Sequence, residues 1–315
     1  MASTDPPLSS LEVEIRRLCQ QIDERGKEYW WVKAEVAAMF ERYGYHLLPR
    51  HFYTPIPDPE TAAGTDFNKE TFPITKLHFN ETEALTFLDG VRDRASELIG
   101  QFPAMEPSGS DYYWKNPFFT GLDAASLFTM IRSLRPRKVI EIGSGFSTHI
   151  ALRALELNGQ GSLTCMEPYP TPKLLELSGR IEILQRGVQK APRDAFSSLS
   201  SGDILFIDSS HVSCMGSDVN FEILEILPNL AQGVVVHLHD IFLPFEYPRE
   251  WVVDRRWYWN EQYLLYAFLR MNESFEVWMP NLYMTRRHNK KVAEAIPFLD
   301  SGSQSGVSFW MRKTT

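Results

Sequence analysis

The chain has 315 residues, of which 43% are hydrophobic and 23% are charged, a composition typical of a globular protein with one large domain or two modest ones. Its formal net charge is −8, so we expect no nucleic-acid partner, because the phosphate backbone of a nucleic acid would be repelled. No apolar stretch approaches the roughly 20 residues that a membrane span needs, and we expect no membrane partner.

The N-terminus and the cysteines indicate a cytoplasmic protein. The first ten residues are rich in Ser and Pro and lack the apolar run of a signal peptide. Cys19, Cys165 and Cys214 show no paired spacing, which favours a reducing compartment over a disulfide framework.

Residues 1–110 are predicted to form an N-terminal extension of helices and loop that covers the substrate. Apolar residues recur at helical spacing from Leu11 to Tyr43. Three prolines at alternate positions within residues 51–59 exclude a helix or a central strand there. A further helix fits residues 80–101 and begins after a plausible N-cap, Asn80.

Residues 111–315 are predicted to form an α/β domain. After a helix at 123–134, short and nearly continuous apolar runs alternate with helical segments, as a parallel sheet covered on both faces requires. These runs are Val139–Ile142, Ser162–Met166, Ile181–Leu184, Asp203–Asp208 and Gly233–Leu238. Two more candidate strands lie at 275–279 and 306–311, and we expect the last to be antiparallel. The fold expected is a doubly wound, mostly parallel, seven-stranded sheet.

A glycine loop, Glu141-Ile-Gly-Ser-Gly-Phe-Ser-Thr148, follows the first of these strands and leads into a helix. Gly143 and Gly145 permit a tight turn and a close approach of the backbone to a ligand, although an ordinary strand-to-helix turn would look similar. Thr148 stands where a dinucleotide fingerprint has its third glycine, which disfavours a nicotinamide oxidoreductase. Glu167, at the end of the second strand, can accept hydrogen bonds from both hydroxyls of a ribose. The pattern predicts a site that binds a nucleoside but not the pyrophosphate of a dinucleotide.

Three segments, Arg135–Thr148, Asp203–His211 and His239–Pro248, resemble the class I S-adenosylmethionine-dependent methyltransferases, and in particular a bacterial branch that acts on small molecules (methyltransferase family 24). The resemblance covers about residues 111–287. It implies S-adenosylmethionine as the cofactor, with the methionine part against the glycine loop and the ribose on Glu167. The cofactor-binding residues expected are Glu141, Gly143, Ser144, Gly145, Ser147, Glu167 and Asp208.

Acidic and histidine residues follow the fourth and fifth strands, and the carboxyl ends of parallel strands are where open sheets bind ligands. Asp208, His211, His239 and Asp240 are therefore expected to converge. One use is proton chemistry, with His211 or His239 as the base and Asp208 beside it. The other is a divalent metal, magnesium or a transition metal, on Asp208, His239 and Asp240. A third reading is that the two aspartates only cap following segments.

Metal-dependent O-methyltransferases that resemble this chain place acidic ligands at the same strand ends. The His239-Asp240 pair departs from their acid–acid or Asp-Asn pattern, which favours a softer ion than magnesium. His237 lies deeper on the strand and is interpreted as a core residue.

A loop rich in aromatic residues and arginine, 244–259, is predicted to cover an organic acceptor. The expected substrate-binding residues are Tyr53, Tyr247, Trp257 and Asn260. The function predicted is methyl transfer from S-adenosylmethionine to a hydroxyl of a small organic molecule. A catalytically inactive nucleoside-binding protein is the main alternative, ahead of a metal-dependent hydrolase suggested by His-Leu-His-Asp at 237–240. The sequence leaves open whether the protein forms homo-oligomers.

Overall fold

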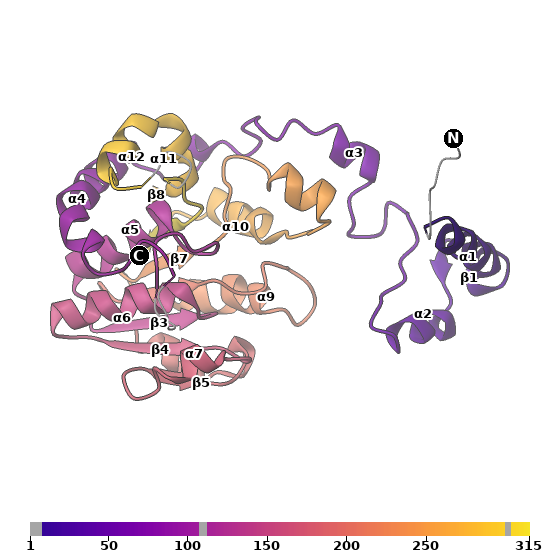
Figure 1. Ribbon diagram of the computed structural model, residues 1–315, viewed down its shortest axis with the longest axis horizontal. Coiled ribbons are helices and arrows are strands. Elements are labelled where there is room, and N and C mark those ends of the chain that lie inside the picture. Colours follow the sequence, from indigo (N-terminus) through magenta and orange to yellow (C-terminus); the bar gives the residue numbers. More distant parts are fainter. Residues whose placement is uncertain (1–7, 107–111, 300–303) are drawn as a thin grey trace. The chain divides into compact units, whose positions relative to one another are not determined.

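The computed structural model describes residues 8–106, 112–299 and 304–315 (Figure 1). The chain divides into two compact units, one of Met1–Thr65 with Glu250–Tyr258 and one of Asp66–Arg249 with Trp259–Thr315. This boundary differs from the one predicted at residues 110/111, where Asp111 itself lies outside the described residues. The reason is helix α4 (Glu81–Ile99), whose apolar face is buried in the core of the second unit.

The first unit consists of short elements. They are α1 (Leu8–Gln21), η1 (Ile22–Gly26), the antiparallel strands β1 (Lys27–Glu28) and β2 (Trp31–Val32), α2 (Ala34–Glu41), α3 (Pro59–Ala63) and η6 (Glu250–Asp254). Helix α3 begins within the proline-rich segment because Asp58 caps it, accepting hydrogen bonds from the amides of Glu60 and Thr61, and Pro59 fits the first helical position. Among the described residues of this unit, only Ile22, Gly26 and Ala62 are buried.

The second unit contains the seven-stranded sheet that the apolar runs predict. Its strands are β3 (Lys138–Ile142), β4 (Ser162–Met166), β5 (Glu182–Leu184), β6 (Ile204–Ile207), β7 (Val235–Leu238), β8 (Phe275–Pro280) and β9 (Phe309–Lys313). They are ordered β5-β4-β3-β6-β7-β9-β8. The first five are parallel, and β9 is antiparallel to both β7 and β8. The predicted fold class is confirmed, including the antiparallel last strand.

Strand β9 begins three residues later than the candidate strand, at Phe309 instead of Gly306. The preceding backbone is held by the buried carboxylate of Asp123, which accepts hydrogen bonds from the amides of Val307 (2.9 Å) and Ser308 (2.7 Å). These amides are therefore engaged outside the β-ladder.

Helices cover both faces of the sheet, so all residues of β6 and β7 are buried. The remaining helices are η2 (Ile74–Lys76), α5 (Gly121–Leu134), α6 (Phe146–Asn158), α7 (Pro172–Leu175), η3 (Val188–Lys190), α8 (Arg193–Ser197), α9 (Asp218–Phe221), η4 (Glu222–Ile226), η5 (Leu227–Asn229), α10 (Glu261–Arg270), α11 (Asn281–Arg287) and α12 (Asn289–Ala295). Helix α12 packs against α4, which lies far away in the sequence (Figure 1).

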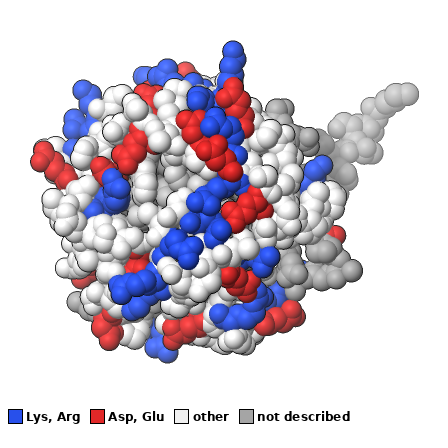
Figure 2. Space-filling model, turned by 90° about the vertical axis from the view of Figure 1, so that its left-hand side faces the viewer, with Lys and Arg blue, Asp and Glu red and all other residues white. Residues whose placement is uncertain are grey.

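The surface mixes charges of both signs. On the face in Figure 2, Lys and Arg side chains are interspersed with Asp and Glu side chains. No helix in the described part of the chain combines the length and the apolar character needed to cross a membrane.

Candidate active site

The chain reverses its direction of strand addition at β3, because β4 and β5 lie on one side of it and β6 and β7 on the other. Open α/β sheets bind ligands outside the carboxyl ends of the strands at such a switch point. Ile142, at the end of β3, is paired with Met166 of β4 and with Ile207 of β6, so these three strands end at the same level. The segments that follow them form the candidate site.

The glycine loop connects β3 to α6. Gly143 has a φ of +74°, which favours glycine, and its amide donates a hydrogen bond to the carbonyl of Met166 (3.0 Å). Gly145 is exposed, and no atom lies within 4 Å of the position that a Cβ would take there. The loop is therefore tight at its first glycine and open to solvent at its second.

Glu141 points into the glycine loop and ties it together. Its buried carboxylate accepts hydrogen bonds from Ser147 Oγ (2.7 Å), Thr148 Oγ1 (2.5 Å) and Cys165 Sγ (3.2 Å). Burial raises the pKa of Glu141 to about 7, and the hydrogen bonds from Thr148 and Ser147 oppose this shift. Thr148, at the position of the missing third glycine, also accepts a hydrogen bond from the amide of Gly145 at the start of α6 (3.1 Å). In this arrangement Glu141 and Ser147 shape the loop.

Glu167 follows β4 and touches the same loop. Its Oε2 accepts a hydrogen bond from the amide of Ser144 (3.3 Å), and its Oε1 accepts one from the amide of Tyr169 (2.8 Å). The carboxylate is half-buried. The structure thus joins the glycine loop and Glu167, the two features that predict a nucleoside site.

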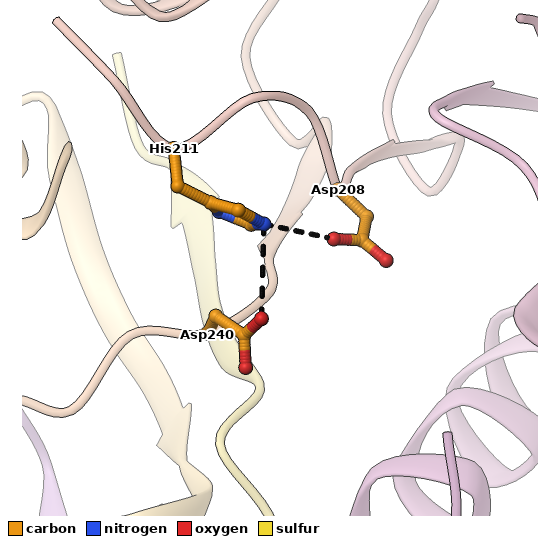
Figure 3. A group of neighbouring side chains, drawn as sticks. All are labelled: Asp208, His211 and Asp240. Carbon is orange, nitrogen blue, oxygen red and sulfur yellow. Dashed lines mark ion pairs between the residues drawn. The ribbon is translucent and has the colours of Figure 1, made fainter. Parts of the chain in front are cut away.

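The acid and histidine cluster forms beyond β6 and β7. His211 Nε2 lies 3.3 Å from Asp208 Oδ1 and 3.7 Å from Asp240 Oδ2 (Figure 3). One side-chain nitrogen or oxygen of each of these three residues lies within 4.8 Å of those of the other two. His239 Nε2 lies 3.9 Å from Asp240 Oδ1 but is not part of this close group. The structure therefore brings His211 to the two aspartates, whereas the predicted metal set contained His239.

Positive charge is strongly favoured between the two aspartates. Although burial alone would lower the pKa of His211, the carboxylates of Asp208 and Glu261 raise it to about 11. Burial would likewise raise the pKa of Asp208, yet the neighbouring His239 and His211 hold it below its usual range. The position between the aspartates is thus suited to a proton on His211 or to a metal cation, and a protonated His211 is a poor general base.

His237, within β7, and His239, which directly follows this strand, occupy different environments. His237 is a core residue, as predicted, stacked on Phe206 with its Nε2 2.8 Å from Ser308 Oγ. Burial lowers its pKa well below the usual range. His239 is buried beside Phe119, and its Nδ1 has no hydrogen-bond partner within the described part of the chain.

Glu261 is a site residue that the sequence reasoning missed. Its buried Oε2 lies 3.0 Å from Nδ1 of His211. A signal was present, because Glu261, Leu265 and Leu269 follow one another at four-residue spacing and all three are buried on one face of α10. A carboxylate on the apolar face of a helix needs a buried partner.

The predicted substrate residues are divided between the two compact units. Asn260 holds Ser213, accepting a hydrogen bond from its amide (2.5 Å). Tyr247 is buried, and its hydroxyl accepts a hydrogen bond from the amide of Gln262 (3.1 Å), so it does not present an exposed wall to an acceptor. Tyr53 and Trp257 belong to the other compact unit, where their side chains are 66% and 37% exposed.

A family model described as a methyltransferase domain matches residues 140–241. This segment runs from β3 through the glycine loop and β6 to the end of the acid and histidine cluster. A protein of Archaeoglobus fulgidus, described as uncharacterized, is 28% identical over 173 residues, which cover 50% of this chain and 75% of that protein.

Two solved structures are similar over most of their length. The O-methyltransferase TomG of Streptomyces achromogenes, solved with S-adenosylmethionine, is 13% identical, with a TM-score of 0.40 over 73% of this chain and 90% of that one. The O-methyltransferase of Bacillus cereus, solved with S-adenosylhomocysteine, is 15% identical. Its TM-score is 0.35 over 73% of this chain and 91% of that one.

Proposed function

We propose that this chain is a class I S-adenosylmethionine-dependent methyltransferase that transfers the methyl group to a hydroxyl of a small organic molecule. One observation carries the cofactor part of the proposal. The glycine loop and Glu167 are joined by a hydrogen bond at the switch point of the sheet.

The residues around this loop fit the cofactor. Gly145 leaves open space above the loop, and the half-buried carboxylate of Glu167 can accept hydrogen bonds from ribose hydroxyls. We propose that the backbone at Gly143, Ser144 and Gly145 faces the methionine part. Glu141 and Ser147 would act indirectly, by holding the loop in shape.

For the acceptor part, the cluster beyond β6 and β7 fits a divalent cation. Asp208, His211 and Asp240 offer two carboxylates and one imidazole at close range. A cation held there would favour the ionised form of a hydroxyl and orient it. The chain's own contribution is alignment, since the ends of the strands fix the ligand side chains beside the cofactor loop. We propose that His239 accepts the hydroxyl proton, because its Nδ1 has no hydrogen-bond partner among the residues that the structure describes.

We also propose that the first unit binds the organic body of the acceptor. This unit contains a cavity of about 1040 Å³ whose lining includes Phe52, Ile56, Val253, Arg256 and Tyr258. Tyr53 lies in an aromatic cluster with Trp30 and His51. Apolar and aromatic walls with a few polar groups are typical of small-molecule sites.

Calorimetry with S-adenosylhomocysteine and NAD tests the cofactor assignment. The full-length protein is expected to bind the first and not the second. Glu167→Ala should weaken binding by about 1–3 kcal/mol, as expected for a hydrogen bond to a charged group, whereas Glu182→Gln, at an exposed carboxylate on β5, should not. NAD binding without S-adenosylhomocysteine binding would refute the assignment.

Labelled S-adenosylmethionine and a panel of hydroxylated small molecules test the reaction. Label should appear on an oxygen of one acceptor class. Binding of the cofactor with no transfer to any acceptor in a broad panel would favour a nucleoside-binding protein without catalytic activity.

A further inference from the structure

The first turn of α10 holds His211 by both its side chain and its backbone. The imidazole Nδ1 lies 3.0 Å from Glu261 Oε2. The carbonyl oxygen of His211 accepts hydrogen bonds from the amides of Asn260 (3.1 Å) and Glu261 (3.2 Å). Two consecutive residues of the sequence thus make three contacts with a residue about fifty positions away.

These contacts stabilise an unfavourable backbone conformation. His211 has a φ of +61°, in the left-handed region that is unfavourable for a residue with a Cβ. The Asn260 side chain also accepts a hydrogen bond from the Ser213 amide and donates one to the Ser213 carbonyl (3.3 Å). The ring of Trp259 packs against the imidazole with 4.3 Å between ring centroids. The loop that carries His211 is therefore fixed to α10.

The orientation of the imidazole follows from the contact with Glu261. A carboxylate accepts but does not donate, so the Nδ1 atom beside Glu261 carries the proton. The other ring nitrogen, Nε2, then faces Asp208 and Asp240 (Figure 3). A carboxylate on one nitrogen of an imidazole commonly determines which nitrogen is available to a cation or a substrate.

We propose that Glu261 is a positioning residue, which holds a proton on Nδ1 of His211, so that Nε2, facing the Asp208–Asp240 pair, is the nitrogen that can exchange its own proton for a cation. This inference rests on the proposed function for its role in catalysis, but the contact itself does not. Glu261 acts through His211 and needs no contact with the acceptor. The chain offers a matched control in Glu222, which is also a buried carboxyl but is hydrogen-bonded to Ser209 Oγ (2.9 Å).

Proton NMR of the full-length protein in EDTA tests the contact directly. A proton shared between an imidazole nitrogen and a buried carboxylate resonates far downfield and exchanges slowly. We expect such a resonance on Nδ1 of His211 in the unmodified protein. It is assigned by its loss in His211→Gln and, with ¹⁵N-labelled histidine, to Nδ1 instead of the Nε2 that faces Asp208. It should disappear in Glu261→Ala, shift upfield in Glu261→Gln, and remain in Glu222→Gln. Persistence of the resonance in folded Glu261→Ala would overturn the proposal, and the isosteric Glu261→Gln keeps the test valid if the alanine variant does not fold.

Calorimetry with Mn²⁺ alone tests the consequence for the cluster. Losing the partner of a metal-bound histidine typically weakens metal binding by about 10–100-fold. We expect a loss of this size in Glu261→Ala, partial rescue in Glu261→Gln and no change in Glu222→Gln. Unchanged affinity in both Glu261 variants would count against the positioning role. If the unmodified protein binds no Mn²⁺, the metal part of the proposed function fails, and the NMR result alone decides on Glu261.

Discussion

Gly143 lies directly against the backbone of Asp208, so that a Cβ on Gly143 would be only 1.8 Å from the Asp208 carbonyl oxygen. The glycine loop and the first residue of the acid and histidine cluster are therefore in contact. We expect Gly143→Ala to destabilise the fold by about 2–5 kcal/mol, because the new methyl group meets backbone at a positive φ. Chemical unfolding would measure the loss.

Gly145→Ala is the matched control for this substitution. A Cβ at Gly145 has no neighbour within 4 Å, and its φ of −170° is extended backbone. Its stability should stay within about 1 kcal/mol of the unmodified protein. Equal stability of the two variants would show that Gly143 and the Asp208 backbone are not in tight contact.

Glu141 should make the protein less stable as the pH rises. Burial raises its pKa from 4.5 to about 7 in the folded state, so between these values the folded protein binds a proton that the unfolded chain has released. Stability from this group is complete below about pH 4.5 and is lost as the pH rises through about 7. Over this range of pH, the loss of the Glu141 contribution lowers the free energy of unfolding by about 3 kcal/mol.

Glu141→Gln isolates this effect, because glutamine can accept hydrogen bonds and does not titrate. Urea unfolding measures the free energy of unfolding of both proteins at pH 5 and pH 8. From pH 5 to pH 8, the stability of the variant relative to the unmodified protein should increase by about 2–3 kcal/mol. A difference that is the same at both pH values would contradict the burial of a proton-binding Glu141.

Asp208 and Asp240 should both be needed for divalent cation binding. In Asp208→Asn and Asp240→Asn we expect Mn²⁺ affinity to fall by at least about tenfold, since each variant removes a charged oxygen ligand. Calorimetry would measure this, with Asp89→Asn, at a half-exposed residue of α4 that is ion-paired with Arg92, as the control. His211→Gln and His239→Gln separate the two candidate histidines, and a larger loss in His239→Gln would favour the ligand set predicted from sequence.

Trp257 should affect binding of the acceptor and not binding of the cofactor. Its ring is packed against Trp251 and lies under Arg255, in the unit that we propose to bind the acceptor. In Trp257→Ala and Tyr53→Ala we expect the KM for the acceptor to rise about 2- to 10-fold, as for the loss of one aromatic contact. The affinity for S-adenosylhomocysteine should not change. Tyr43→Ala, at another exposed tyrosine of this unit, is the control, and equal KM effects in all three would argue against a specific contact.

The sequence by itself determined the sheet and the cofactor loop. The five parallel strands and the two that follow are visible as apolar runs, because a strand that is buried on both faces of a sheet consists of consecutive apolar residues. The loop from Gly143 to Gly145 is equally local, since its turn and the start of α6 depend on neighbouring residues. Even the convergence of Asp208, His211 and Asp240 follows from strand ends that lie side by side.

Only the tertiary structure decided how the side chains of the site pair with one another. His211 and His239 have the same ring and lie near the same edge of the sheet, yet only His211 reaches both aspartates, because α10 holds its backbone at a φ of +61°. The contact with Glu261 and the burial of Tyr247 likewise depend on packing between distant segments. Hydrophobic periodicity records which face of an element is buried, but the direction of a polar side chain is set by the partner that compensates its lost hydration.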